Sequence, residues 1–532
     1  MAEGRRLVGG RLLRWDDERA SQAYTQGHWA RGTLADALRA AAQDTPRRVA
    51  LVDADHRLTC AELRLQATAL ADALLERIPA GSVVSFMLPN WHEAAVIYLA
   101  STLAGMVANP ILPSLREREL RFILEDADSR VLFIPSAFGR HDYAAMLHRV
   151  VAELTTPPDV VVVRGDCLDG QLGYASLTSP RSGSVPLPGL QPDDVRMILY
   201  TSGTTGRPKG VLHSQNSIHA LMCQIRDHWF VEPGDVFLVA SPIAHIGGSI
   251  YAFEGPLLLG TTAVLMDRWN ADEAVRIIRT ERCTHMAGAT PFLEQLLAAA
   301  QRAGTNLPDL KVFICGGASV SPQLIRRAAT YFESTTVTRV YGSTEVPVTT
   351  VGSPDDRDRA ADTDGRAGIA DIRLVDGEIR LRGPQMLVGY LHPEDDDNSF
   401  DADGYFRTGD LGRWVDDEYL VVTGRAKDII IRNGENISPK EVEDVLVTHP
   451  GIAEIAVVGL PDERTGERAC AVVVAASSAG PDVTDLRTFL EAAGVARFKA
   501  PEQVVIWDDL PKNDAGKILK HQIKAALMEA ER

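Results

Sequence analysis

The sequence contains no apolar run that approaches the roughly 20 residues needed to cross a membrane. Its first residues, 1–19, are mixed in charge and include no apolar stretch of signal-peptide length. Both absences favour a cytoplasmic protein without a transmembrane segment. Four arginines near the N-terminus could touch a membrane surface, but a frayed terminus is the favoured alternative. They are Arg5, Arg6, Arg11 and Arg14.

Cysteine is scarce, and positive charge is in deficit. The 532 residues include six cysteines without any Cys-x-x-Cys pair, which argues against a zinc site or a disulfide framework and predicts reduced, buried thiols. Lysine and arginine number 55 against 72 aspartates and glutamates, a net charge of −17. Such a chain is not expected to bind nucleic acid, although a local field can still attract an anionic small ligand.

Short, turn-bounded apolar runs are spread through the first two thirds of the chain, with helical patterns between several of them. This arrangement predicts an α/β unit built on mostly parallel, buried strands. The runs lie at 49–52, 81–90, 131–134, 159–163, 236–240, 262–266 and 311–315.

The pattern of apolar and polar residues changes after residue 365. The segment IRLVDGEIRLRG alternates with period two around Asp376-Gly377, which predicts a β-hairpin and local antiparallel sheet. Beyond Arg425 the pattern indicates a compact α+β unit of about 100 residues. Ser438 and Glu441 frame a capping box there, with Pro439 at the first helical position. We therefore divide the chain into domains 1–424 and 428–532, joined by a hinge at 425–427.

The stretch YTSGTTGRPKG, residues 200–210, has a composition suited to phosphate binding. Gly203 and Gly206 leave backbone amides unobstructed, neighbouring hydroxyls add donors, and Lys209 adds a point charge. The alternative is a flexible polar loop, but Pro208 and the apolar residues before the loop fix its ends. The spacing is neither that of a Walker A loop nor that of a nucleophile elbow.

Further motifs follow this loop, and together they resemble the acyl- and aryl-adenylating enzymes, the superfamily of acyl-CoA synthetases, peptide-synthetase adenylation domains and luciferases. The family's motifs occur in the family's order: SPIAHIGG (241–248), YGSTE (341–345), YFRTGD (405–410), GRAKDIIIRNGENISPKEVE (424–443) and PKNDAGKILK (511–520). The resemblance implies a large N-terminal domain of mostly parallel sheets flanked by helices plus a β-barrel-like part. It also implies a small, mobile C-terminal α+β domain.

The resemblance assigns roles to residues of these motifs. Glu345, with Thr201, would bind Mg²⁺, which prefers oxygen ligands. Asp410 would accept hydrogen bonds from the ribose diol. The catalytic set would be Lys517, Glu345, His245 and Thr204. The cofactor-binding set would be Thr201, Ser202, Gly203, Thr205, Gly206, Lys209, Gly317, Ala318, Ser319, Tyr341, Gly342, Ser343, Thr344, Asp410, Arg425, Lys427, Gly434 and Glu435.

Several of these residues have simpler interpretations. A lone His245 in an apolar setting is more often a core histidine, and Lys517 by itself is a surface lysine. By resemblance, His245 lies at the carboxylate pocket and Lys517 drives adenylation. The chain departs from the family pattern at Tyr405, where tryptophan is frequent, and at Asn513 and Lys520, where threonine and arginine are usual. None of these changes removes the lysine ammonium.

The implied reaction has two steps and uses ATP, Mg²⁺ and coenzyme A. A carboxylate attacks the α-phosphate of ATP to give an acyl-adenylate and pyrophosphate, and the thiol of coenzyme A then displaces AMP. Between the steps the C-terminal domain would rotate about Lys427 and bring Gly434 and Glu435 to the pantetheine tunnel. A linker lysine is the simpler interpretation of Lys427.

Two questions remain open at the level of sequence. The acceptor could be a carrier protein instead of coenzyme A, or the chain could be a non-catalytic nucleotide-binding member. The oligomeric state is also open, with a homodimer among the alternatives. Small or apolar residues around His245 suit a hydrocarbon tail. The sequence as a whole resembles those of ligases for medium-chain, branched or alicyclic acids. The candidate pocket walls are Tyr251, Ala287, Gly288, Thr290 and Pro347.

Overall fold

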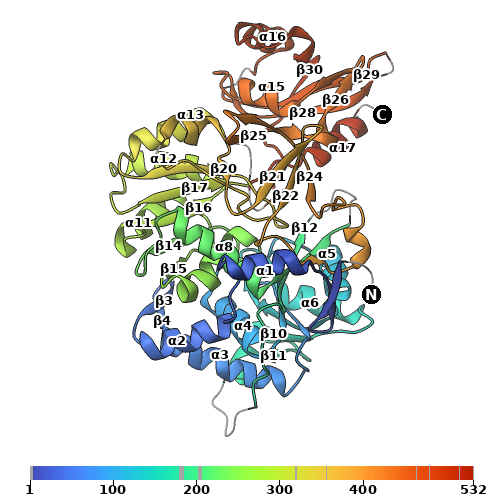
Figure 1. Ribbon diagram of the computed structural model, residues 1–532. Coiled ribbons are helices and arrows are strands. Elements are labelled where there is room, and N and C mark those ends of the chain that lie inside the picture. The colour runs from blue at the N-terminus through green and yellow to red at the C-terminus, as the bar shows by residue number, and fades with distance from the viewer. Residues whose placement is uncertain are drawn as a thin grey trace.

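A computed structural model describes residues 4–178, 185–201, 207–317, 320–354, 356–462, 464–477, 480–513 and 516–530. Within them the chain forms a large lower body and a smaller upper lobe that contains the last hundred residues (Figure 1). The body holds two large sheets and an antiparallel sheet that faces the lobe. The α/β fold class expected from the sequence is confirmed.

The first large sheet has eight strands, in the order β11-β10-β7-β5-β6-β12-β13-β23. Its pairings are parallel except at β12–β13 and β13–β23, so the stretch 200–210 connects two antiparallel neighbours. The strands are β5 (Val83–Phe86), β6 (Val107–Pro110), β7 (Ser129–Pro135), β10 (Asp159–Val163), β11 (Leu172–Gly173), β12 (Val195–Thr201), β13 (Lys209–Ser214) and β23 (Gly389–Tyr390).

The second large sheet has seven strands, in the order β18-β17-β16-β14-β15-β3-β4, and is parallel except at β3–β4. The strands are β3 (Val49–Asp53), β4 (His56–Thr59), β14 (Val236–Val239), β15 (Thr262–Leu265), β16 (His285–Gly288), β17 (Val312–Gly316) and β18 (Thr336–Val340). The apolar runs singled out in the sequence form strands in these two sheets, because buried parallel strands are apolar on both faces.

Helices cover both sheets, and one lies between them. Helix α4 (His92–Leu103) contacts β5 and β6 of the first sheet and β3 of the second, and its residues 93–103 are all buried. The other helices of the body are α1 (Asp17–Thr25), α2 (Leu34–Asp44), α3 (Cys60–Leu75), α5 (Glu117–Asp126), α6 (Tyr143–Ala152), α7 (Tyr174–Thr178), α8 (Gln215–His228), α9 (Ile246–Ser249), the π-helix η1 (Ile250–Glu254), α10 (Gly255–Leu258), α11 (Ala271–Glu281), α12 (Thr290–Arg302), α13 (Pro322–Tyr331) and α14 (Arg357–Asp362).

The antiparallel sheet has the order β19-β20-β25-β24-β22-β21. Its strands are β19 (Thr350–Val351), β20 (Arg366–Ala367), β21 (Asp371–Val375), β22 (Glu378–Arg382), β24 (Phe406–Val415) and β25 (Tyr419–Arg425). The hairpin predicted at Asp376-Gly377 is present, and both turn residues have positive φ, 52° and 81°. Two left-handed residues define the tight hairpin turn that an Asp-Gly pair favours.

The upper lobe packs its own sheet between helices. Its elements are β26 (Ile430–Arg432), β27 (Glu435–Ile437), β28 (Ile452–Asp462), β29 (Gly466–Ala475), β30 (Gln503–Ile506), α15 (Pro439–Leu446), α16 (Val483–Ala492) and α17 (Lys520–Ala530). Ser438 caps α15 as expected, by accepting from the Glu441 amide. The reciprocal half of the predicted capping box is absent, because the Glu441 carboxylate instead pairs with Lys499 at 2.6 Å.

The expectation of a frayed N-terminus is wrong for residues 5–14. They form a hairpin of β1 (Arg5–Val8) and β2 (Arg11–Arg14). The guanidinium of Arg14 lies 3.6 Å from the ring centre of Phe400, Arg5 pairs with Asp396 at 3.4 Å, and Leu13 is buried. These contacts involve residues almost 400 positions away, so local sequence patterns do not reveal them.

Two expectations from composition can be compared with the structure. None of the six cysteines, all of which lie in the described part of the chain, forms a disulfide, and four are buried, whereas Cys167 is exposed and Cys223 is partly exposed. Among the described residues, no helix has the length and apolarity required to cross a membrane.

Candidate active site

The β12–β13 hairpin sets the two ends of the predicted phosphate loop opposite each other. Thr201 and Lys209 are register partners, while Ser202, Gly203, Thr204, Thr205 and Gly206 lie outside the described residues. The ammonium of Lys209 lies 3.6 Å from the Asp395 carboxylate and 4.9 Å from the Tyr390 ring centre. Arg207 donates to both Asp395 oxygens at 2.8 Å. A carboxylate thus holds both cations that follow the loop.

The YGSTE motif lies after β18 and reaches the same tyrosine. Tyr390 donates to a Glu345 carboxylate oxygen at 3.1 Å, so Glu345 contacts the hydroxyl and Lys209 the ring of one side chain. Gly342 makes the turn possible, because a Cβ there would lie 2.6 Å from the Val348 nitrogen. Ser343 closes the turn by accepting from the Val346 amide at 3.1 Å. The predicted metal ligand Glu345 and the lysine of the predicted phosphate loop therefore contact the same tyrosine.

His213 is a residue of this site that the sequence analysis missed. It lies on β13, is fully buried, and its Nε2 lies 2.7 Å from the Thr344 carbonyl oxygen. Because a carbonyl only accepts, Nε2 carries the proton and donates. Burial lowers the pKa of His213 to about 4, so the ring is neutral. The one available signal was a histidine within an apolar strand directly after a glycine-rich loop.

A second cluster joins the YGSTE motif to the antiparallel sheet. Tyr341 donates to Asp410 Oδ2 at 2.8 Å, and Arg425 Nε lies 2.8 Å from Asp410 Oδ1. Burial, followed by the charge of Asp410, raises the pKa of Tyr341 well above its usual value. A carboxylate has about four acceptor positions, so Asp410 keeps capacity for further hydroxyl donors. The structure thus brings three predicted nucleotide-site residues into one hydrogen-bonded group.

Lys517 belongs to the upper lobe but lies beside this second cluster. Desolvation and the nearby positive charge of Arg425 lower the pKa of Lys517 to about 8, while the charge of Asp410 opposes the shift. The neighbouring Gly516 abuts the body, since a Cβ there would lie 3.0 Å from Pro291. Asn513, the residue that departs from the family pattern, accepts from the Lys517 amide at 2.8 Å. The lobe therefore presents its lysine loop to the body.

His245 and Gly317 follow strands β14 and β17 of the second sheet, which lie on either side of β16. His245 is partly buried at the start of α9, after the loop that follows β14. Gly317 follows β17 with φ at +82°, which favours glycine, and the two predicted residues after it, Ala318 and Ser319, lie outside the described part. Strands β14 and β17 both pair with β16 in parallel, so these segments emerge at the same edge of the sheet.

Three predicted residues lie apart from this group or at its margin. Lys427 is exposed in the short 3-10 turn η3 (Ala426–Asp428), which connects the body to the lobe, and its charge acts on Lys517. Gly434 and Glu435 are exposed at the tip of the β26–β27 hairpin. The backbone next to them bonds to Thr465 of the same lobe. In this arrangement the lobe presents Lys517 to the body and keeps the hairpin tip in solvent.

Comparisons with known proteins agree with this architecture. The family model for AMP-binding enzymes matches residues 38–391, and the model for the C-terminal domain of AMP-binding enzymes matches residues 441–517. The chain therefore belongs to the AMP-binding enzyme family.

The relatives specify the class of reaction. The medium-chain fatty-acid–CoA ligase of Escherichia coli is 33% identical over 541 residues, which cover 97% of this chain and 94% of that protein. A 3-[(3aS,4S,7aS)-7a-methyl-1,5-dioxo-octahydro-1H-inden-4-yl]propanoyl:CoA ligase of Rhodococcus jostii is 33% identical over 92% of this chain and 98% of that one. The chain is accordingly an acid–thiol ligase of the AMP-forming acid–CoA ligase family.

Two solved structures of one protein are informative about the conformation of this chain. ATP-bound MatB from Rhodopseudomonas palustris superposes with a TM-score of 0.82, at 28% identity over 94% of this chain and all of that one. The apo form of MatB, with the same coverage and identity, gives only 0.72. Because the two MatB structures share one protein, the difference reflects conformation, and the chain described here is closer to the ATP-bound arrangement.

Proposed function

We propose that the chain activates a carboxylic acid with ATP to an acyl-adenylate and then transfers the acyl group to coenzyme A. The observation that carries the proposal is the position of Lys517, from one lobe, beside the Asp410–Arg425 pair of the other. In this arrangement the ammonium lies close enough to a carboxylate suited to a ribose diol for the charge of that carboxylate to act on it. The greater likeness to ATP-bound MatB than to apo MatB supports the same conclusion.

The residues around Lys209 fit a magnesium-bound triphosphate. Lys209 and Arg207 would exchange part of their contact with Asp395 for phosphate oxygens, since phosphate is also a strong acceptor. Glu345 provides the carboxylate oxygen that Mg²⁺ prefers, and the ion would neutralise charge on the phosphates. His213 fixes the carbonyl of Thr344 and so holds the turn that presents Glu345.

In the first step, Lys517 would stabilise the charge that builds on the α-phosphoryl oxygens. The ammonium then acts more strongly on the transition state than on the bound reactants, which is the condition for a rate increase. Partial desolvation at the boundary between the lobes strengthens this interaction because the local dielectric constant is lower than that of water.

In the second step, the lobe would rotate so that the thiol of coenzyme A can approach. Lys427 lies in η3, between the two lobes, and the exposed tip with Gly434 and Glu435 would then move to the pantetheine path. A 3-10 turn has φ near −60°, which proline also adopts. A proline at position 427 is therefore compatible with the present arrangement and resists rotation away from it.

The acid is proposed to be medium-chain, branched or alicyclic. Gly247, whose missing Cβ would meet nothing within 4 Å, leaves room near His245, and Tyr251 stacks on Phe237 among buried apolar residues. The names of two relatives, a medium-chain fatty-acid ligase and a ligase for a fused-ring propanoate, agree with such a tail.

The decisive experiment measures the two steps separately. A panel of linear, branched and alicyclic acids is assayed for acid-dependent ATP–pyrophosphate exchange, and then for AMP release with free coenzyme A or with a carrier protein bearing a phosphopantetheine arm. We expect exchange with tails of medium length and AMP release with free coenzyme A. Absence of exchange with every acid would contradict adenylation, and AMP release only with the carrier protein would reassign the acceptor.

Variants of Lys427 test the rotation. Lys427→Pro should retain exchange and lose thioester formation, whereas the control Lys427→Ala should keep both because its backbone stays free. Equal losses in both steps for the proline variant would contradict a hinge at this position.

A further inference from the structure

The loop between β14 and α9, residues 240–245, carries His245 but forms neither helix nor strand. Its backbone polar groups therefore need partners from elsewhere in the fold. Ser241 provides one contact, from its hydroxyl to the Ala287 carbonyl at 3.2 Å. Gly248 allows the chain to pack closely on this loop, because a Cβ there would lie 2.2 Å from the Pro242 oxygen. The His245 amide bonds the Pro242 carbonyl at 3.0 Å, and the His245 carbonyl accepts from the Gly248 and Ser249 amides at 2.9 Å. Further partners come from a side chain outside this loop.

That side chain is Asn90, which is 4% exposed and follows strand β5 of the first sheet. Its Nδ2 donates to the Val239 carbonyl at 3.1 Å and to the Ser241 carbonyl at 3.0 Å. Its Oδ1 accepts from the Ile243 amide at 3.1 Å. An amide group is suited to this role because it combines two donors and an acceptor in one plane. Asn90 thus uses both ends of its side chain on the last residue of β14 and on the loop that follows it.

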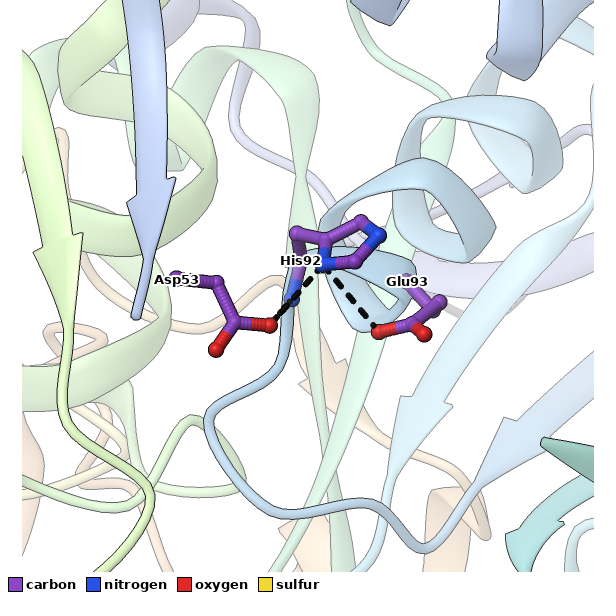
Figure 2. A group of neighbouring side chains, drawn as sticks. All are labelled: Asp53, His92 and Glu93. Atoms are coloured by element: carbon purple, nitrogen blue, oxygen red, sulfur yellow. Dashed lines mark hydrogen bonds and ion pairs between the residues drawn. The ribbon is translucent and has the colours of Figure 1, made fainter. Parts of the chain in front are cut away.

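The segment that carries Asn90 is itself anchored by an ion-pair network. Figure 2 shows His92 between Asp53 and Glu93, and its Nδ1 lies 2.8 Å from Asp53 and 3.4 Å from Glu93. The guanidinium of Arg164 bonds both oxygens of Glu93 at 2.7 Å and also reaches Asp53. Although burial opposes ionisation, the bonds from His92 and Arg164 hold the pKa of Asp53 at about 2.

This network ties the two large sheets together next to Asn90. Asp53 ends β3 of the second sheet, His92 and Glu93 begin α4, and Arg164 follows β10 of the first sheet. Because Arg164 already provides the positive charge between the two carboxylates, the cluster acts as an anchor. Trp91, under the Arg164 guanidinium at 4.2 Å, completes it. Asn90 therefore lies next to a backbone segment that this network holds in place.

We propose that Asn90 is a positioning residue for the acid side of the site: it fixes the loop 240–245 and thereby the place of His245. This inference rests on the proposed function, in which His245 borders the carboxylate pocket. Asn90 should therefore affect binding of the acid and leave binding of the nucleotide unchanged. The reason is that the hydrogen bonds of the Asn90 side chain go to the end of β14 and to the loop that follows it.

The first test uses Asn90→Asp, which keeps size and one acceptor but turns two donations into repulsion toward the Val239 and Ser241 carbonyls. We expect the KM for the acid in pyrophosphate exchange to rise about tenfold, the effect of one or two neutral hydrogen bonds, with the KM for ATP unchanged. Asn109→Asp is the matched control, since Asn109 is also a buried asparagine of the first sheet but bonds Ser85. Equal rises in both KM values, or the same rise in the control, would overturn the proposal.

A second measurement does not depend on activity. Hydrogen–deuterium exchange of the wild-type chain and of both variants should show faster exchange across 240–245, with the Ile243 amide most affected, in Asn90→Asp only. Unchanged protection there would overturn the role of Asn90 even if the KM for the acid rose. If the wild-type chain shows no acid-dependent activity, the proposed function fails, and this exchange pattern still decides whether Asn90 holds the loop.

Discussion

The two sides of the candidate site are held by different forces. On the proposed nucleotide side, charged groups lie near one another: Lys209 pairs with Asp395, Arg425 pairs with Asp410, and the charges of Arg425 and Asp410 act on Lys517. On the proposed acid side, Asn90 bonds a loop through neutral hydrogen bonds, and Gly248 permits close packing. Ion pairs act over several ångströms and respond to pH, whereas neutral hydrogen bonds depend on shape. The nucleotide side should therefore be sensitive to charge and the acid side to geometry.

The largest effect is expected from Lys517→Ala. Loss of one electrostatic contact to the transition state should lower the rate of pyrophosphate exchange by roughly 10²–10³, while ATP binding measured by calorimetry changes little. Lys512→Ala is the control, because Lys512 lies in the same segment but pairs with Glu454 at 2.6 Å. If ATP binding weakened as much as the rate fell, Lys517 would bind the ground state and the catalytic role would be wrong.

A smaller effect is expected from Asp410→Asn, which removes the charge that pairs with Arg425. Hydrogen bonds to a charged group contribute about 1.5–3 kcal/mol, so the KM for ATP should rise roughly 10–10²-fold while the KM for the acid stays the same. Asp376→Asn, at a hairpin turn of the same sheet, is the control. A parallel rise in the KM for the acid would show that the two sides are not separately held.

His213 allows the charge sensitivity of the nucleotide side to be measured as stability. Its pKa of about 4 in the folded chain lies below the usual 6.5, so between these pH values only the unfolded chain takes up the proton. Stability therefore falls as the pH drops, by about 2 kcal/mol from pH 7 to pH 5. Urea unfolding at pH 7 and pH 5 should show that His213→Gln lacks this pH-dependent fall in unfolding free energy. The control His56→Gln, at an exposed position, should retain it.

The smallest effect concerns the pH dependence of the first step. With the pKa of Lys517 at about 8, kcat/KM for ATP should fall about tenfold for each pH unit above that value, because the ammonium loses its proton. The corresponding alkaline fall of kcat should occur at higher pH, because the anionic nucleotide stabilises the ammonium form of Lys517 in the bound complex. In Lys517→Arg this alkaline fall of kcat/KM should disappear. If kcat/KM of the wild-type chain fell only near pH 10, the desolvated position of the Lys517 ammonium would be contradicted.

Local signals predicted much of the fold. The hairpin at Asp376-Gly377 and the cap at Ser438 depend on neighbouring residues only, and both are present. The predicted frayed terminus was wrong because Arg5 and Arg14 find partners beyond residue 390. The same limitation applies to the site: His213 and Asn90 act on backbone groups more than 100 positions away, and no local pattern specifies such contacts.

By itself the sequence determined the order of the strands along the chain, the positions of the turns and, through its motifs, the family. These depend on side-chain alternation and on glycine or proline at given positions, which act over a few residues. Only the tertiary structure decided that Lys517 lies beside Asp410, that His213 is neutral, and that Asn90 holds the loop of His245. Those features depend on desolvation and on contacts between distant segments, which arise only when the sheets and the lobes pack together.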